Sequence, residues 1–137
     1  MNKKEIEKAC KDLNRLVPIV TWWHKRKFPN ETLKSQELKI EEEIGELEAA
    51  DWNYMLNPTP ENESLFYEEA ADCFISICGK RRWKRTVAEY QLNTLGFDHV
   101  DNVVKHVEAI KAKLWINHKS SFVVVDGVNK RVKVEND

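Results

Sequence analysis

Residues 39–50 read KIEEEIGELEAA, a stretch that predicts a helix with one apolar face and an acidic edge. At about 100° per residue, three apolar residues of this stretch fall on one stripe and define the face that is buried. These residues are Ile40, Ile44 and Leu47. Glu43 lies about 60° from the stripe and Glu46 about 120° from it, on the same side. Both glutamates are therefore expected at the edge of the buried face.

A second acidic pair follows on the next predicted helix. The apolar stripe of that helix consists of Phe66, Ala70, Cys73 and Ile77. Glu69 and Asp72 lie along one edge of this stripe, at about 60° and 120° from its centre. The two helices thus repeat one arrangement, Glu43-x-x-Glu46 and Glu69-x-x-Asp72. Antiparallel packing through the apolar stripes is expected to bring the four carboxylates together.

Four converging carboxylates need a counter-charge, because burial and mutual repulsion both disfavour their charged forms. An all-oxygen ligand set favours Mg²⁺, for which Mn²⁺ can substitute, and bound Mg²⁺ commonly contacts substrate phosphates as well. A di-iron helical bundle also uses inward-facing glutamates but needs Glu-x-x-His pairs. None of the four histidines has a glutamate three positions before it. The remaining alternative is a pair of amphipathic helices whose acidic edges are solvated.

The chain of 137 residues has the length of one domain, so a single unit over residues 1–137 is expected. Helical periodicity predicts an all-α fold, a bundle of four to five helices over about residues 3–116. The expected helices are one bent or restarted at Pro18, one from Leu33 to Leu56, one from Glu63 to Ile77 capped by Gly79, and one from about Phe97 to Leu114. Asp126-Gly127 between two β-favouring runs predicts a small C-terminal hairpin at about residues 120–135.

Charge and composition narrow the possible partners and compartments. Lys and Arg number 22 against 23 Asp and Glu, a net charge of −1, so no basic surface for nucleic acid is expected. No stretch has the length and hydropathy of a signal peptide or a membrane span, so no membrane partner is expected. Three cysteines without a C-x-x-C pair suit reduced thiols, which predicts a cytoplasmic protein.

KIEEEIGELEAA followed by EEAADCFISI resembles the two acidic helices of the MazG-like, all-α nucleoside triphosphate pyrophosphohydrolases, relatives of dimeric dUTPases and phosphoribosyl-ATP pyrophosphohydrolases. The family signature is E-E-x-x-E, a spacer and E-x-x-D, which corresponds here to Glu42-Glu43-x-x-Glu46 and Glu69-x-x-Asp72. The resemblance implies Mg²⁺-dependent hydrolysis of a nucleoside triphosphate to the monophosphate and pyrophosphate. It also implies that Glu43, Glu46, Glu69 and Asp72 bind the metal. Glu42 and Glu43 are the implied catalytic residues, with Glu42 orienting the attacking water.

Residues that bind the substrate are expected around this motif. Lys39 shares the helix face of Glu43 and would reach a phosphate, with an ion pair to Glu43 as the alternative. Trp23 and Trp52 are candidates for stacking on the nucleobase, with packing as the alternative. Family members also carry a Lys on the last helix, an Asn four residues later and a basic residue three beyond. Lys105 is the expected start, but residues 109 and 112 are alanines.

Two functions from different classes remain open: a nucleotide pyrophosphohydrolase, and a non-catalytic helical module that binds nucleotides or proteins. The absence of the Lys-x-x-x-Asn spacing from Lys105 favours the module. The four retained carboxylates favour the enzyme, since buried charges cost stability when no metal binds. The helix expected at residues 65–78 is so apolar that one small bundle cannot cover all of its apolar surface. A homodimer or a dimer of dimers is therefore expected.

Overall fold

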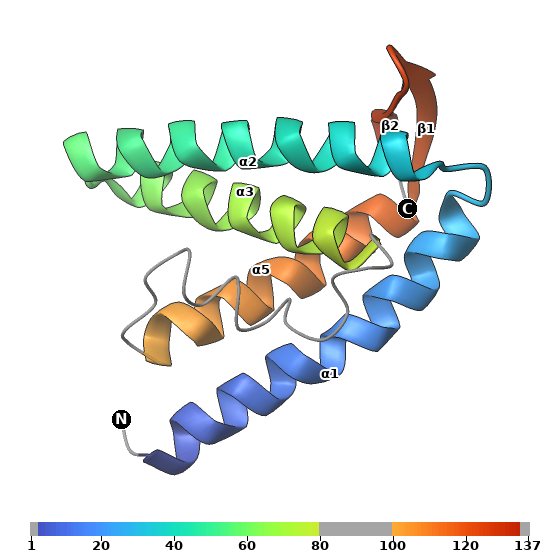
Figure 1. The fold of residues 1–137 in the computed structure, drawn as a ribbon. Coiled ribbons are helices and arrows are strands. Elements are labelled where there is room, and N and C mark those ends of the chain that lie inside the picture. Colours follow the sequence, from blue (N-terminus) through green and yellow to red (C-terminus); the bar gives the residue numbers. More distant parts are fainter. Residues whose placement is uncertain (1–2, 80–99, 135–137) are drawn as a thin grey trace.

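The computed structural model describes residues 3–79 and 100–134, which form four helices and one β-hairpin (Figure 1). The elements are α1 (Lys3–Lys27), α2 (Leu33–Leu56), α3 (Pro60–Gly79), α5 (Val100–His118), β1 (Ser120–Val125) and β2 (Val128–Val134). The expected helical fold with a C-terminal hairpin is confirmed. The expected start of the last helix near Phe97 lies outside the described residues. Within the described ranges, no helix combines the length and apolar character that crossing a bilayer requires.

The helices α2 and α3 form an antiparallel pair that lies side by side in Figure 1. Thr32 caps α2 reciprocally with Ser35: Thr32 Oγ1 accepts a hydrogen bond from Ser35 N at 3.1 Å, and Ser35 Oγ accepts one from Thr32 N at 2.9 Å. At the start of α3, Asn62 N donates to Thr59 Oγ1 at 3.1 Å. These caps determine where the two acidic helices begin, and so which of their residues lie opposite each other.

The central helix of the fold is α3, which contacts α1, α2 and α5. Eleven of its 20 residues are buried, against three of the 24 residues of α2, so α3 is the more deeply buried of the two acidic helices. Its nearly continuous apolar sequence explains this position, since a helix that is apolar on most sides must be covered on most sides. The largest fully buried side chains come from α1, α3 and α5 and include Leu13, Phe74, Ile77 and Ile110.

Two helix boundaries differ from the expected ones. α1 runs through Pro18 as one continuous helix, so the expected restart does not occur. Thr21 Oγ1 lies 2.7 Å from the carbonyl of Val17 and 2.9 Å from that of Cys78, which ties α1 to α3 just beyond the proline. Packing of this kind offsets the backbone hydrogen bond that proline removes. α3 begins at Pro60 rather than Glu63, since proline is tolerated in the first turn of a helix.

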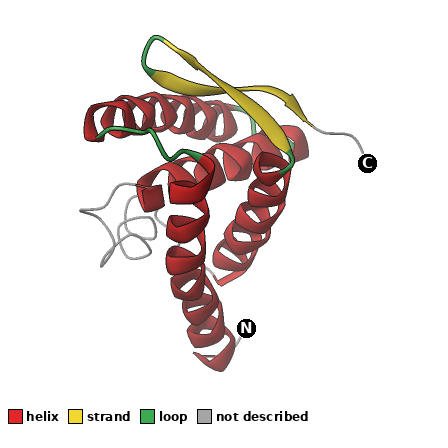
Figure 2. Cartoon of the chain, turned by 90° about the vertical axis from the view of Figure 1, so that its right-hand side faces the viewer, coloured by secondary structure: helices red, strands yellow, loops and turns green. Residues whose placement is uncertain are grey.

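The C-terminal hairpin closes through the predicted two-residue turn. Asp126 and Gly127 have φ angles of 53° and 78°, as the turn type that matches strand twist requires. β1 pairs antiparallel with β2, with one irregularity between Ser121 and Phe122. Figure 2 shows the hairpin lying across the helices, and β2 contacts both α2 and α5. The hairpin therefore covers the end of the molecule where α2 begins (Figure 1).

Gly79 ends α3, but it does not adopt the left-handed conformation of a helix-capping glycine; of the described glycines, Gly127 alone has a positive φ. The requirement for glycine at position 79 is instead steric. A Cβ atom there would lie 2.6 Å from Cε1 and from Nε2 of His24. The absence of a side chain therefore allows the imidazole of His24 to pack directly on the backbone of α3.

Replacement of Gly79 by alanine is expected to lower the free energy of unfolding by about 1 to 3 kcal/mol, because the added methyl group overpacks a buried site. Denaturant unfolding followed by circular dichroism measures this change. Gly45→Ala is the matched control, since a Cβ at Gly45 meets no atom within 4 Å and alanine favours a helix. Equal stability of the two variants would show that His24 moves aside without cost.

Candidate functional site

Carboxylates from α2 and α3 meet at one point of the fold. One oxygen atom each of Glu43, Glu69 and Asp72 lies within 4.8 Å of the other two. Glu43 is only 4% exposed, and Glu69 and Asp72 are half-buried. Glu46 is exposed at the rim and shares a side-chain hydrogen bond with Glu69. The antiparallel helices thus bring together all four residues of the two acidic pairs.

The surroundings of these acids disfavour their charged forms. Desolvation by burial raises the pKa of Glu43 and that of Glu69 to about 7, and neighbouring carboxylates add to both shifts. Burial also raises the pKa of Asp72, an effect that the charge of Lys113 opposes. Glu43 Oε2 and Glu69 Oε2 are buried and accept no hydrogen bond. Because an unsatisfied buried oxygen is costly, the cluster suits a bound cation.

Basic side chains from three elements face the acids. The ion pairs are Lys39 with Glu43 (2.8 Å), Lys113 with Asp72 (3.5 Å), and Lys130 with Glu42. Lys39 belongs to α2, Lys113 to α5 and Lys130 to β2. The charge of Arg131, the next residue of β2, also opposes the rise in the pKa of Asp72 that burial causes. The acids are therefore faced by Lys39, which shares α2 with Glu43, and by cationic groups of α5 and β2, which are distant in the chain.

All of these groups except Glu69 line a cavity of about 280 Å³, and Glu69 lies beside it in contact with the other acids. Its acidic wall comes from α2 and α3, its basic and amide wall mainly from α5 and β2, and its aromatic end from α1, β1 and the chain after α1. The acidic wall includes Glu42, Glu43, Glu46 and Asp72. The basic and amide wall includes Lys113, Asn117, Asn129, Lys130 and Arg131. The aromatic end includes Trp23, His24, Phe28 and Phe122. One cavity thus offers carboxylates, cations and aromatic rings.

At the aromatic end, Phe28 lies among three other rings. Its ring centroid is 5.9 Å from that of Trp23, 5.0 Å from that of His24 and 4.9 Å from that of Phe122. Trp23 Nε1 also donates a hydrogen bond to His118 Nδ1 at 3.3 Å, which orients the indole. The aromatic cluster is therefore held by ring contacts and by one polar contact.

Glu31 lies beside this aromatic cluster, between α1 and α2. Its Oε2 accepts a hydrogen bond from Asn129 Nδ2 at 2.9 Å, and its Oε1 lies 3.4 Å from His24 Nδ1. Burial lowers the pKa of His24 to about 4, so the imidazole is neutral near pH 7. Burial also raises the pKa of Glu31, while hydrogen bonds from Asn129 and Gln36 oppose that shift.

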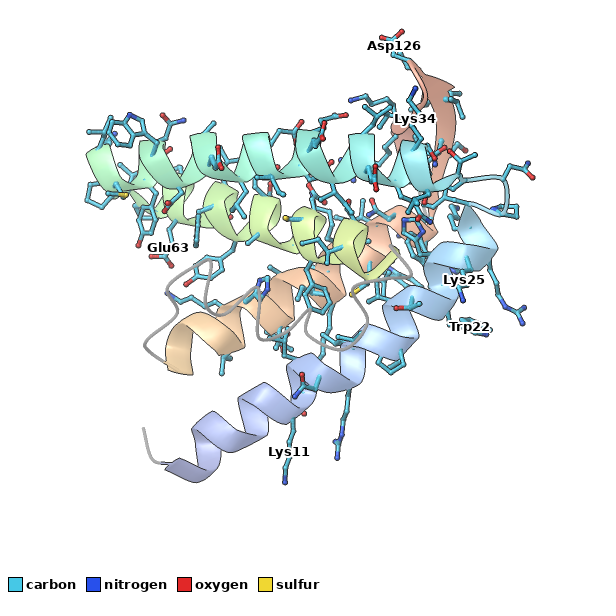
Figure 3. All side chains as sticks on the ribbon, viewed as in Figure 1. Lys11, Trp22, Lys25, Lys34, Glu63 and Asp126 are labelled. Atoms are coloured by element: carbon cyan, nitrogen blue, oxygen red, sulfur yellow. The ribbon has the colours of Figure 1, made fainter. Side chains whose placement is uncertain are left out.

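Of the residues expected to bind substrate, Trp23 and Lys39 line the cavity, whereas Trp52 and Lys105 are not among its lining residues. Trp52 is 60% exposed and lies about 9 Å along α2 from Glu46. Lys105 Nζ lies 2.6 Å from Glu63 Oε1. Figure 3 shows Glu63 at the end of the helical pair away from the hairpin. The fold therefore does not bring Trp52 or Lys105 to the acidic cluster.

The Lys-x-x-x-Asn spacing that fails at Lys105 occurs further along the same helix. Lys113 is followed four residues later by Asn117, and both side chains line the cavity. This signal was present in the sequence but two turns beyond the expected start. The cavity residues Asn129 and Lys130, in contrast, had no such signal, because only folding brings the hairpin to α2.

Comparison of the chain with protein-family models, with curated proteins and with solved structures found no match. The cavity itself offers three kinds of contact. Its buried carboxylates suit a divalent cation, its lysines and arginine suit phosphate groups, and its aromatic end suits a planar ring.

Proposed function

We propose that the protein is a Mg²⁺-dependent pyrophosphohydrolase that converts a nucleoside triphosphate to the monophosphate and pyrophosphate, on a helical fold of the MazG-like type. The observation that supports this proposal is the cavity that buried carboxylates and cationic side chains share. Carboxylates alone suit a metal ion, but with cations opposite them they suit a polyphosphate bound to that metal. The resemblance of the two acidic motifs to the family signature agrees with this function.

Glu43, Glu46, Glu69 and Asp72 are the residues that would hold Mg²⁺, with Mn²⁺ as a substitute. Their fit to such an ion rests on the buried, unpartnered oxygens of Glu43 and Glu69 and on the all-oxygen donor set. When bound, the ion would neutralise charge on the triphosphate and lower the pKa of a water molecule.

The cations across the cavity would bind the phosphates of the substrate. Lys113 and Asn117 face the acids from α5, and Lys130 and Arg131 face them from β2. A phosphate group would compete for Lys130 and so release its partner Glu42. Glu42 would then accept the proton of the water whose oxygen attacks the α-phosphorus, while the bond from that phosphorus to the leaving pyrophosphate breaks.

Incubation with nucleoside triphosphates and Mg²⁺ is expected to yield the monophosphate and pyrophosphate in equal amounts. Phosphorus NMR identifies both products, because each has its own resonances. Chelation by EDTA should stop the reaction, and excess Mg²⁺ or Mn²⁺ should restore it. Orthophosphate and a diphosphate as main products, or undiminished turnover in EDTA, would contradict the proposal.

The alternative is a non-catalytic module that binds nucleotides or proteins. Its main support is the absence of the Lys-x-x-x-Asn spacing from Lys105. The same spacing occurs at Lys113 and Asn117, but the basic residue that the family carries three positions beyond the Asn is Ser120 here, so part of that support remains. Saturable nucleotide binding without turnover in the same reaction would favour the module.

A homodimer or dimer of dimers is part of the same proposal. Ile19 and Trp22 of α1 are 54% and 58% exposed, and Trp115 of α5 is 60% exposed. Trp22 points away from the other helices in Figure 3. Exposed aromatic and aliphatic groups of this kind are enriched at subunit contacts.

A further inference from the structure

Glu31 is a buried carboxylate outside the acidic cluster. Its side chain is 4% exposed, and it lines the cavity at the aromatic end. Asn129 anchors Oε2 with a hydrogen bond of 2.9 Å. Oε1, in contrast, is buried and accepts no hydrogen bond, and His24 Nδ1 stands 3.4 Å away from it. The protein therefore holds the carboxylate in place while one of its two oxygens, Oε1, accepts no hydrogen bond.

The surroundings of Glu31 define which kind of donor fits. The rings of Phe28, His24 and Phe122 lie at the same end of the cavity, so the donor must come on a flat, largely apolar group. His24 is buried and neutral, so it does not supply the positive charge that would satisfy the carboxylate. An aromatic heterocycle that carries N–H groups on its edge meets both conditions, because its faces contact rings while its edge donates.

The edges of the nucleobases differ in what they present to a carboxylate. Guanine offers two adjacent donors, the ring N1–H and the 2-amino group. Adenine and cytosine place a ring-nitrogen acceptor beside their amino group, and uracil and thymine flank their ring N–H with two carbonyl oxygens. A carboxylate attracts donors and repels acceptors. Guanine is therefore the base whose edge suits Glu31 best.

We infer that Glu31 reads the base of the substrate and selects guanine nucleotides, with Asn129 as the residue that positions its carboxylate. The inference rests on the proposed function for the triphosphate end of the substrate, because Glu43 and Asp72 of the acidic cluster line the same cavity as Glu31. It also extends that function, since it names the class of nucleotide and a residue that determines specificity.

The direct test is binding of GMP, AMP, CMP and UMP to the wild-type protein and to Glu31→Gln, measured by calorimetry in the presence of Mg²⁺. The wild-type protein should bind GMP about tenfold or more tightly than the other three, in the range of one well-placed base contact. In Glu31→Gln, the amide oxygen would keep the hydrogen bond from Asn129 and the amide NH₂ would face the base. That donor opposes the donor edge of guanine, so the preference for GMP should be lost.

Glu48→Gln is the matched control, because Glu48 is exposed on α2 and does not line the cavity. It should keep the wild-type preference. Asn129→Ala is a second test that leaves Glu31 in the chain, and it should weaken the preference by freeing the carboxylate. If Glu31→Gln does not fold, as judged by circular dichroism, the result with Asn129→Ala decides.

The outcomes separate this inference from the proposed function. Selective GMP binding that Glu31→Gln abolishes, without pyrophosphate release from GTP, would support base reading and contradict the hydrolase. Pyrophosphate release from GTP, ATP, CTP and UTP at equal rates would support the hydrolase and overturn the inference. A folded Glu31→Gln variant that still prefers GMP would overturn the inference as well.

Discussion

Substitution of Glu43 by glutamine is expected to lower the rate of pyrophosphate release about a thousandfold, because a metal ligand contributes several kcal/mol of transition-state stabilisation. Glu43 is the most deeply buried member of the acidic cluster, and its Oε2 accepts no hydrogen bond. A neutral amide keeps the shape of the side chain but loses the charge that would hold the cation. A coupled assay for pyrophosphate at saturating Mg²⁺ and nucleotide measures the change.

Glu41→Gln is the matched control for this substitution, since Glu41 is exposed on the same helix and outside the cavity. It should retain the wild-type rate. Thermal unfolding of both metal-free variants tests whether either substitution lowers the stability of the fold. Glu43→Gln should unfold at the wild-type temperature or above, because it removes a buried charge. A folded Glu43→Gln protein with wild-type turnover would show that the metal binds elsewhere.

The second large effect is that Mg²⁺ should stabilise the protein most at mildly alkaline pH. The pKa values of Glu43 and Glu69 are raised from 4.5 to about 7 in the folded state. Because both pKa values are raised in the folded state, the contribution of these two carboxyl groups to the free energy of unfolding is fully present below pH 4.5. This contribution is lost as the pH rises through about 7. Metal-free protein should therefore lose on the order of 1 kcal/mol between about pH 6.5 and pH 8, with solvent screening reducing the share of the partly exposed Glu69.

This pH window separates the carboxylates from the buried histidines. Burial lowers the pKa of His24 to about 4 and that of His106 to about 3, so both are neutral in the folded state above pH 6.5. Because the pKa values of both histidines are lowered from the ordinary value of 6.5, the free energy of unfolding rises with pH up to about pH 6.5. Above that pH the histidines change it little. A fall in stability above that pH is then assigned to the acids, and Glu43→Gln should reduce it.

Mg²⁺ at about 100 times its dissociation constant should add about 2.7 kcal/mol at pH 8, which corresponds to roughly 10 °C in the midpoint of thermal unfolding. Differential scanning calorimetry with and without EDTA measures the difference. Glu43→Gln should show little of this stabilisation. A midpoint that is insensitive to Mg²⁺ in the wild-type protein would leave the cluster without a cation to bind.

Part of the site could be predicted from helical spacing because the relevant geometry is local. The period of 3.6 residues placed Glu43 at the edge of an apolar stripe, and the structure buries it. The same period placed Asp72 on the facing helix, and the short connection between α2 and α3 made antiparallel packing the simplest arrangement. The turn at Asp126 was equally local, since two residues with positive φ determine it.

Other expectations failed because position in the chain and local propensity did not determine what each residue contacts in space. Trp52 is close to Glu46 in sequence, but the helix carries it away from the acids and leaves it exposed. Pro18 was expected to bend or restart the first helix, and α1 continues through it without a restart, with contacts of Thr21 across the core just beyond the proline. Gly79 was expected as a helix cap, and its requirement instead comes from His24, 55 residues earlier in the chain.

The sequence by itself determined the helices, the hairpin turn and the edge on which each acidic pair lies, because all three depend on residues within a few positions of one another. Only the tertiary structure decided what faces the acids. Lys113, Asn129 and Lys130 come from α5 and β2, and Glu31 from the connection between α1 and α2. These residues share one cavity because the hairpin and α5 pack onto the α2–α3 pair, and such contacts between distant segments have no periodicity that a sequence displays.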